Sequence, residues 1–280
     1  MPVGRPRGSD FELAVLRHLR DENRNVLDLQ LDGPWLAELA RNVPDALHQM
    51  RKRGTLRTLQ RGRYLVATDE PPAGRRPRPR LDELDPVADA VLRRLGIEYY
   101  VSWHSALWHH GLVDQQSRRI YVATTQRKRP VKLGMAEVRF VTVTERKFFG
   151  GERIEDFEWP VWMATVEKAL IDSLDQPRLA APVPVVANAL KRAHRDGMLD
   201  PERLVADALR FGSPTLNRRL GFFMDLYAIP GSEPLTSQLG RKYAVALAPG
   251  REPDGDRPPV NRRWRVYEDP AIVGTAMELK

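Results

Sequence analysis

The spacing of apolar residues near the start of the chain predicts one helix followed by one strand. Phe11, Val15 and Leu19 recur at helical spacing, which indicates a helix over about residues 10–22. Leucine then alternates with polar residues over 27–31, which is the period of a half-buried strand. Each element has one apolar side, so we expect both to pack into the core of one small domain.

Two short helices with a tight break between them are predicted next. Asp32 and Pro34 start the first, because aspartate is a good N-cap and proline is tolerated in the first turn. The break falls at residues 41–42, a third helix begins near Pro44, and Gly54 ends it. Two short helices joined in this way are typical of a helix-turn-helix.

A β-hairpin is predicted to follow the third helix. Residues 55–67 alternate as a strand, a turn with Arg61 and Gly62 at its tip, and a second strand. A strand, a helix-turn-helix and a hairpin in this order predict a winged helix. Residues 1–68 are therefore predicted to form an N-terminal winged helix-turn-helix domain.

Most of the net charge of +8 falls within this predicted domain. Seven cations and one acid lie between Arg41 and Tyr64, so this segment carries +6. Glutamine can read adenine, and cations can contact guanine or phosphate, which favours binding to double-stranded DNA. The alternative is a small α/β domain with a solvated basic face. The predicted DNA-binding residues are Arg41, Asn42, Asp45, His48, Gln49, Lys52, Arg53, Arg57, Arg61 and Arg63.

The rest of the chain is predicted to be a linker and a second domain. Residues 69–84 contain a Pro-Pro pair and an alternating Arg-Pro run, which favour a semi-rigid linker. Residues 85–280 mix predicted helices (165–174, 184–194, 201–210, 214–227) with predicted strands (98–101, 120–123, 138–143). The predicted fold class is thus α+β, with an N-terminal winged helix-turn-helix domain followed by a larger mixed α+β domain.

Four stretches, in this order and spacing, resemble the AbiEi-type antitoxins of bacterial type IV toxin–antitoxin systems. The first resembles that family's wing, the second its strand-to-helix segment, and the third and fourth two later helices. The stretches are Gly54-Thr55-Leu56 to Gly62-Arg63-Tyr64, Tyr99 through Leu107 to His110-Gly111-Leu112, Ala164 to Asp172, and Arg219-Leu220-Gly221-Phe222-Phe223.

The resemblance implies a function in two parts. The winged helix would bind inverted repeats in the chain's own promoter and repress transcription. The C-terminal domain would counter a toxin of the nucleotidyltransferase type, usually encoded by the neighbouring gene. Double-stranded DNA and that toxin are therefore the expected partners.

The sequence shows no pattern that favours catalysis or metal binding. The chain has no cysteine, which excludes a disulfide scaffold, a thiolate zinc site and a cysteine nucleophile. His104 and His109 are five residues apart, so they do not lie on the same face of a helix and are not spaced to bind one metal ion together. The histidines are therefore expected to be structural. Lys168 and Asp172, at i and i+4, are expected to form an ordinary surface ion pair. We expect no catalytic residue, no metal, no cofactor and no enzyme activity.

A second, shorter group of cations lies in the predicted C-terminal domain. It precedes and follows the predicted strand at 120–123. We interpret it as a possible second contact with nucleic acid or with a partner protein, while a solvated loop remains an equal alternative. The residues are Arg118, Arg119, Arg127, Lys128 and Arg129.

Two other functions stay open at this point. One is a transcription factor whose C-terminal domain senses a ligand and has no toxin partner, and the other is a nucleic-acid enzyme whose site assembles only in three dimensions. No apolar run approaches the ~20 residues of a membrane span, and residues 1–10 lack the apolar region of a signal peptide. A cytoplasmic location without a membrane partner is therefore expected.

Overall fold

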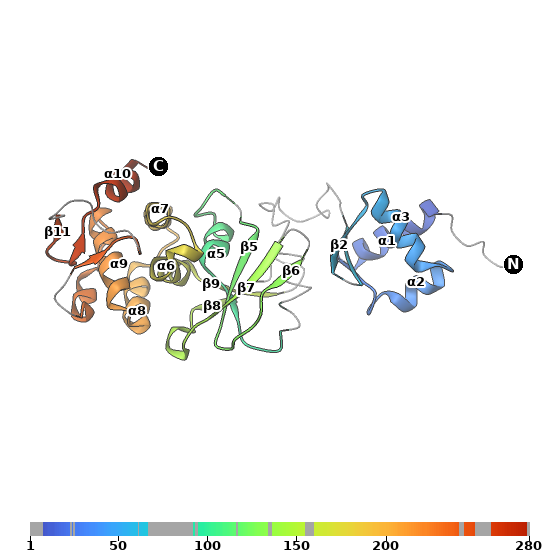
Figure 1. Cartoon of the computed structure of the whole chain (residues 1–280), viewed down its shortest axis with the longest axis horizontal. Coiled ribbons are helices and arrows are strands. Elements are labelled where there is room, and N and C mark those ends of the chain that lie inside the picture. The colour runs from blue at the N-terminus through green and yellow to red at the C-terminus, as the bar shows by residue number, and fades with distance from the viewer. Residues whose placement is uncertain are drawn as a thin grey trace. The chain divides into compact units, whose positions relative to one another are not determined.

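The computed structural model describes residues 8–22, 24, 26–60, 62–66, 92, 95–115, 117–133, 136–154, 160–240, 244–249 and 259–278 (Figure 1). The chain divides into two compact units. The first comprises Met1–Gly96 with Val131–Glu137 and Ile154–Val161, and the second comprises the remaining segments. The predicted linker over 69–84 lies outside the described residues.

The first unit contains three helices and three strands between residues 8 and 66. Its elements are α1 (Gly8–Asp21), β1 (Val26–Asp28), α2 (Gly33–Leu39), α3 (Val43–Lys52), β2 (Leu56–Gln60) and β3 (Arg63–Val66). They follow the order expected from the sequence. The predicted strand over 27–31 is shorter than expected, because the chain turns after residue 28.

The strands of the first unit form one antiparallel sheet of order β1-β3-β2. One apolar core joins this sheet to the helices. It includes Phe11, Val15 and Leu19 from α1 and Leu47 and Met50 from α3, all at most 3% exposed. The regular apolar spacing along α1 and α3 thus places both helices on one core.

The second unit contains most of a six-stranded mixed sheet of order β6-β7-β5-β4-β9-β8. Strand β4 pairs with β5 antiparallel and with β9 parallel. The strands are β4 (Tyr100–Val101), β5 (Arg119–Thr124), β6 (Val131–Leu133), β7 (Ala136–Thr142), β8 (Gly151–Ile154) and β9 (Val161–Ala164).

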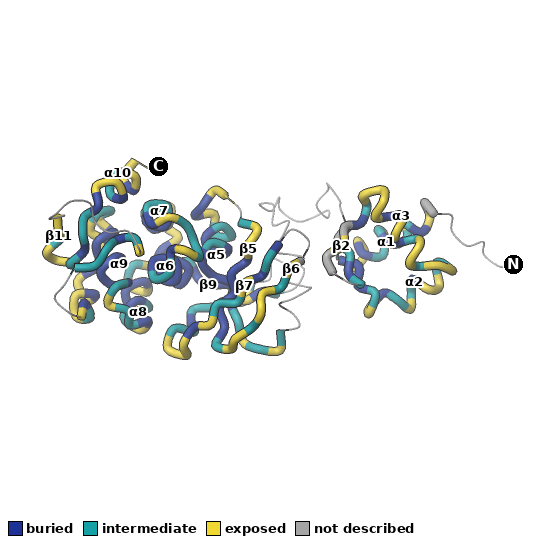
Figure 2. Tube along the Cα trace, viewed as in Figure 1, coloured by how far each residue is buried: buried dark blue, intermediate teal, exposed yellow. Residues whose placement is uncertain are grey.

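Helix α6 lies between α5, which packs on this sheet, and the other C-terminal helices (Figure 1). It contacts α5, α7, α8 and α9, and every residue from Glu167 to Leu174 is buried (Figure 2). The helices are α5 (Trp103–His109), α6 (Val166–Asp175), α7 (Val183–Arg195), α8 (Pro201–Phe211), α9 (Pro214–Leu226) and α10 (Pro270–Glu278). Short 3-10 helices are η2 (Glu145–Lys147), η3 (Pro177–Leu179) and η4 (Glu233–Gln238).

A small three-stranded sheet of order β10-β12-β11 lies near the end of the chain. Its strands are β10 (Val245–Ala246), β11 (Val260–Asn261) and β12 (Val266–Tyr267). The chain is thus a mixed α+β protein, as expected. Among the residues described, no helix has the length and apolar character needed to cross a membrane.

Candidate functional site

The outward face of α3 is polar and exposed, as its spacing predicts. Leu47 and Met50 point into the core, while His48, Gln49 and Lys52 are exposed. Asn42 Oδ1 accepts a hydrogen bond from the backbone N–H of Asp45 at 3.2 Å, so Asn42 caps the helix. This capping bond and the apolar contacts hold α3 in place without using its outward side chains.

Contacts between α1 and the end of α3 fix the position of that end. Arg53 Nη1 donates to Glu12 Oε2 at 2.8 Å, and the hydroxyl of Thr55 donates to Glu12 Oε1. The Arg53 side chain is still 48% exposed. Glu12 therefore anchors the turn after α3, and only part of the Arg53 charge faces solvent.

Arg63 contradicts its predicted role as a DNA-binding residue. Only 1% of it is exposed, and its Nη2 lies 2.7 Å from Asp28 Oδ2. Strand β3 is the central strand of the sheet, and Asp28 on β1 is paired directly with Arg63. Opposite charges on facing positions of paired strands attract each other, so Arg63 serves the fold. The side chain of Arg57 and the whole of Arg61 lie outside the described residues.

A network of charged side chains extends from this ion pair to the start of α2. The backbone N–H of Asp28 donates to Asp32 Oδ2 at 2.8 Å, and Arg24 donates to both carboxylate oxygens of Asp32 at 2.8 and 2.9 Å. Burial opposes the charge on Arg24, but the hydrogen bonds that Arg24 donates to Asp32 and Glu22, with their negative charges, outweigh it and raise the Arg24 pKa. Asp32 was expected to cap α2, yet its side chain makes no capping bond.

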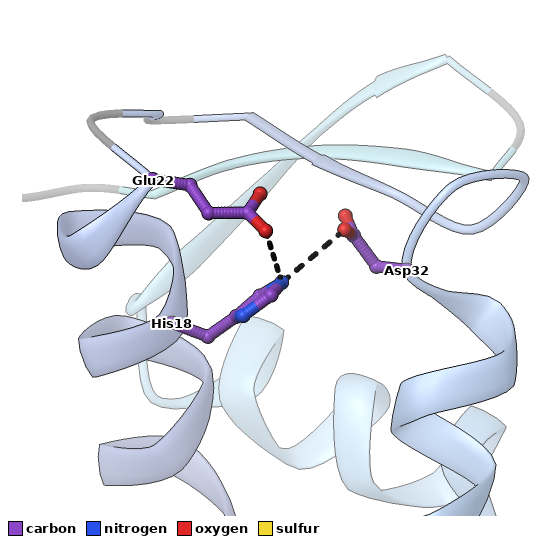
Figure 3. Close-up of side chains that lie close together, drawn as sticks. All are labelled: His18, Glu22 and Asp32. Atoms are coloured by element: carbon purple, nitrogen blue, oxygen red, sulfur yellow. Dashed lines mark ion pairs between the residues drawn. The ribbon is translucent and has the colours of Figure 1, made fainter.

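His18, Glu22 and Asp32 converge beside this network (Figure 3). His18 Nε2 lies 3.6 Å from Glu22 Oε1 and 3.5 Å from Asp32 Oδ1. The imidazole stacks on Trp35, with ring centroids 4.0 Å apart. Within the part of the chain that the structure describes, this is the one group of three histidine, cysteine, aspartate or glutamate side chains whose ligand atoms all lie within 4.8 Å of one another. Sequence reasoning missed it, although His18 and Glu22 are at helical spacing i, i+4.

The second group of cations does not form one patch. Arg118 and Arg119 lie at the start of β5, whereas Arg127, Lys128 and Arg129 follow its end. A six-residue strand spans roughly 17–20 Å, so the two subgroups are at opposite ends of it. Except for the half-buried Lys128, these residues are exposed.

Lys168 and Asp172 are buried, so the expected surface ion pair is wrong. Lys168 is 0% and Asp172 2% exposed. Lys168 Nζ donates to Asp172 Oδ1, and Ser102 Oγ donates to Asp172 Oδ2 at 2.7 Å. Burial lowers the pKa of the Lys168 ammonium and raises the pKa of the Asp172 carboxyl, and their mutual attraction opposes both shifts. Ser102 lies at the N-cap position of α5, but its side chain makes no capping bond there and is used in this network instead.

Aromatic rings enclose the Lys168 ammonium. Its Nζ lies 4.9 Å from the ring centroids of both Phe149 and Phe211, and 5.3 Å from that of Tyr100. A cation over aromatic faces is attracted by their quadrupoles. Burial and the negative charge of Asp172 raise the pKa of Tyr100. With every member buried, the cluster stabilises the sheet against α6 and is not placed to meet a substrate.

Two of the C-terminal histidines bond to backbone carbonyl groups. His104 has Nδ1 2.8 Å from the Ala180 oxygen and Nε2 2.7 Å from the Gln115 oxygen. His110 Nε2 lies 2.8 Å from the Ala164 oxygen, and burial lowers the His110 pKa despite that bond. Their positions agree with structural roles for both rings.

Comparison with known proteins identifies a relative in fold only. The RV2827C protein from Mycobacterium tuberculosis has a crystal structure that matches with a TM-score of 0.65 and 15% identity, over 95% of this chain and 94% of that chain. At this identity the likeness is one of fold. Neither a protein-family model nor a curated protein matches the chain.

Proposed function

We propose that the first unit is a winged helix-turn-helix domain that binds double-stranded DNA, and that the chain is a transcriptional autorepressor and antitoxin. The observation that carries the DNA-binding half is the outward face of α3. It follows a short helix after a tight break, and it exposes His48, Gln49 and Lys52. Among the described residues, α3 packs into the core through Leu47 and Met50 on its opposite side, so this face is available to a partner.

The exposed side chains suit the two tasks of a recognition helix. Gln49 can bond to an adenine edge, and Lys52 can contact guanine or a phosphate. Arg41 and Arg51 are also exposed and add positive charge at the two ends of α3. Phosphate contacts set affinity and position, while base-edge contacts set sequence preference. Arg63 is left out of the proposed interface because it is buried.

The antitoxin half of the proposal rests on the family resemblance. One contact in the second unit supports it, because Ser102 and Asp172, from two of the four family-like stretches, are joined by a buried hydrogen bond. If the family shares this internal scaffold, a serine and an aspartate that bond to each other are expected to occur together in its members. The partner we propose is a nucleotidyltransferase-type toxin acting in the same cytoplasm.

Mobility shift on the chain's own upstream DNA tests the DNA-binding half. Gln49→Ala and Lys52→Ala are expected to weaken binding at least tenfold together, since a good bidentate base contact contributes about 1–3 kcal/mol. Arg17→Ala is the matched control, because it removes an exposed cation from α1 of the same unit. Equal losses in the control and the α3 variants would contradict the assignment of α3.

Co-expression tests the antitoxin half separately. The chain is expected to relieve growth arrest caused by a nucleotidyltransferase encoded beside its gene. Arrest that continues at normal expression of the folded chain would remove the antitoxin claim and leave the DNA-binding claim untouched.

A further inference from the structure

We propose that His18, Glu22 and Asp32 bind one divalent transition-metal ion of the Zn²⁺ class. The three side chains come from two places that are separate in the sequence: the C-terminal end of α1, with Glu22 directly after the helix, and the residue just before α2. Asp32 is 3% exposed, so its carboxylate is directed inward, toward His18, instead of capping α2. This proposal is independent of DNA binding.

The spacing of the ligand atoms fits a tetrahedral ion. Bonds of about 2.0–2.2 Å to imidazole nitrogen and carboxylate oxygen place neighbouring ligand atoms about 3.3–3.5 Å apart. The two distances from His18 Nε2, 3.5 and 3.6 Å, are within a few tenths of that value. All three ligand atoms lie within 4.8 Å of one another.

The donor set and its exposure narrow the class of ion. One imidazole with two carboxylates suits Zn²⁺, Co²⁺ and similar ions, whereas Mg²⁺ prefers oxygen ligands alone. Glu22 is 47% and His18 23% exposed on their side chains, so solvent reaches the cluster from one side. Water can therefore take the fourth position.

Arg24 contacts both carboxylates, and it leaves one oxygen of Glu22 free to face the ion. Its Nη1 lies 2.6 Å from Glu22 Oε2, while Glu22 Oε1 faces His18. At Asp32 it bonds to both oxygens, so Oδ1 is shared between Arg24 and the site. Arg24 thus orients the ligands from outside, as partners of metal ligands do. Its positive charge also lowers the affinity, so we expect a weaker site than a closed structural zinc site.

Binding would cross-link α1 to the start of α2. Because the metal binds the folded unit and not the separated ligands of the unfolded chain, it raises the stability of the first unit. That gives a readout that does not depend on DNA.

Metal titration of the full chain tests the proposal. Zn²⁺ at a hundredfold excess over its dissociation constant is expected to raise the Tm of the first unit by at least about 5 °C, and EDTA to reverse the rise. Co²⁺ is expected to give the visible absorption of a tetrahedral site, and Mg²⁺ to have no effect. Glu22→Gln and His18→Gln are expected to abolish both signals.

Two substitutions serve as matched controls. Asp21→Asn removes an exposed carboxylate beside the site, and His48→Gln removes an exposed imidazole from α3. Both variants are expected to keep the Zn²⁺ and Co²⁺ signals. No rise in Tm and no cobalt spectrum in the wild type would show that the cluster forms ion pairs only, and would overturn the proposal. Signals that survive Glu22→Gln in a folded protein, as judged by circular dichroism, would do the same.

Discussion

Helices α3 and α6 are both ten residues long and both begin at a side-chain cap, but they place their polar residues in opposite environments. On α3 the polar residues face outward and bond little to the rest of the fold. On α6 Glu167, Lys168 and Asp172 are buried among other elements. The Glu167 carboxylate accepts a hydrogen bond from the backbone N–H of Asp200, and Lys168 donates one to Asp172.

The difference shows that a charge on a helix has two distinct uses. A polar side chain that the fold does not use is available to a partner, and α3 carries several of them. A polar side chain that is buried and bonded stabilises one arrangement of the elements around it. The two helices therefore predict different responses to substitution: a large loss of stability at α6, and a change of binding with little change of stability at the outward side chains of α3.

The largest expected effect is the loss of one partner of the buried pair. Asp172→Ala leaves the Lys168 ammonium buried and unpaired, which costs about 3–5 kcal/mol of unfolding free energy. Replacing both residues with apolar ones of similar size is expected to cost much less unfolding free energy, because no buried charge is then left without its partner. Urea unfolding of the full chain, followed through the transition of the second unit, measures both. A cost below about 1 kcal/mol for Asp172→Ala would contradict the account of α6.

A close approach of backbone and ring gives the next largest effect. A Cβ atom at Gly221 in α9 would overlap the six-membered ring of Trp264, which is fully buried. Gly221→Ala is therefore expected to lose about 1–3 kcal/mol through overpacking. Gly274→Ala in α10 is the control, since a Cβ there meets nothing within 4 Å. If both substitutions have the same small effect in urea unfolding, the Gly221–Trp264 contact is not as close as described.

Acid pH is expected to weaken the second unit through His110. Burial lowers its pKa in the folded chain, so below about pH 6.5 the unfolded chain binds a proton that the folded chain does not. The unfolding free energy therefore falls as pH drops from 7 toward 5, by at most about 1.4 kcal/mol per pH unit from this group. His110→Gln is expected to flatten that part of the profile, while His48→Gln on exposed α3 keeps the wild-type slope. A wild-type slope in His110→Gln would contradict the prediction.

The smallest effect is expected at the start of α3, and it has opposite signs for stability and binding. Asp45 lies in the first turn, where a carboxylate favours the helix dipole by about 0.3–1 kcal/mol. Asp45→Asn is expected to lose that stability but to bind DNA more tightly, because one negative charge leaves the interface. Thermal unfolding and mobility shift measure the two changes. If Asp45→Asn raises the Tm and weakens DNA binding, both signs are reversed, and the position of Asp45 at the start of a DNA-binding α3 is contradicted.

Much of the first unit could be predicted from the sequence because its apolar residues keep a regular period. The spacing of Phe11, Val15 and Leu19 in α1 and of Leu47 and Met50 in α3 is the spacing that buries them. The division of α3 into an inner and an outer face follows directly. The arrangement of the whole chain as a mixed α+β protein could likewise be predicted from its mixture of helical and strand patterns.

The buried charges could not be predicted, because burial depends on what packs against a residue. Arg63 looks like any cation of a hairpin until β1 places Asp28 opposite it. Lys168 and Asp172 have the same i, i+4 spacing as a surface ion pair, and the spacing does not reveal that four helices surround α6. The position of Asp32 beside His18 depends on the turn after β1. The alternation of leucines predicts a strand that continues to residue 31, so it does not predict this turn.

The salt dependence of binding to the chain's own promoter tests the role of α3 most directly. Each phosphate contact contributes about −0.9 to the slope of log K against log salt concentration. Arg51→Ala with Lys52→Ala is expected to make the wild-type slope shallower by about 1–2, while Arg17→Ala leaves it unchanged, with all proteins equally stable. A slope that is identical in the wild type and in the α3 double variant would show that DNA does not meet this face.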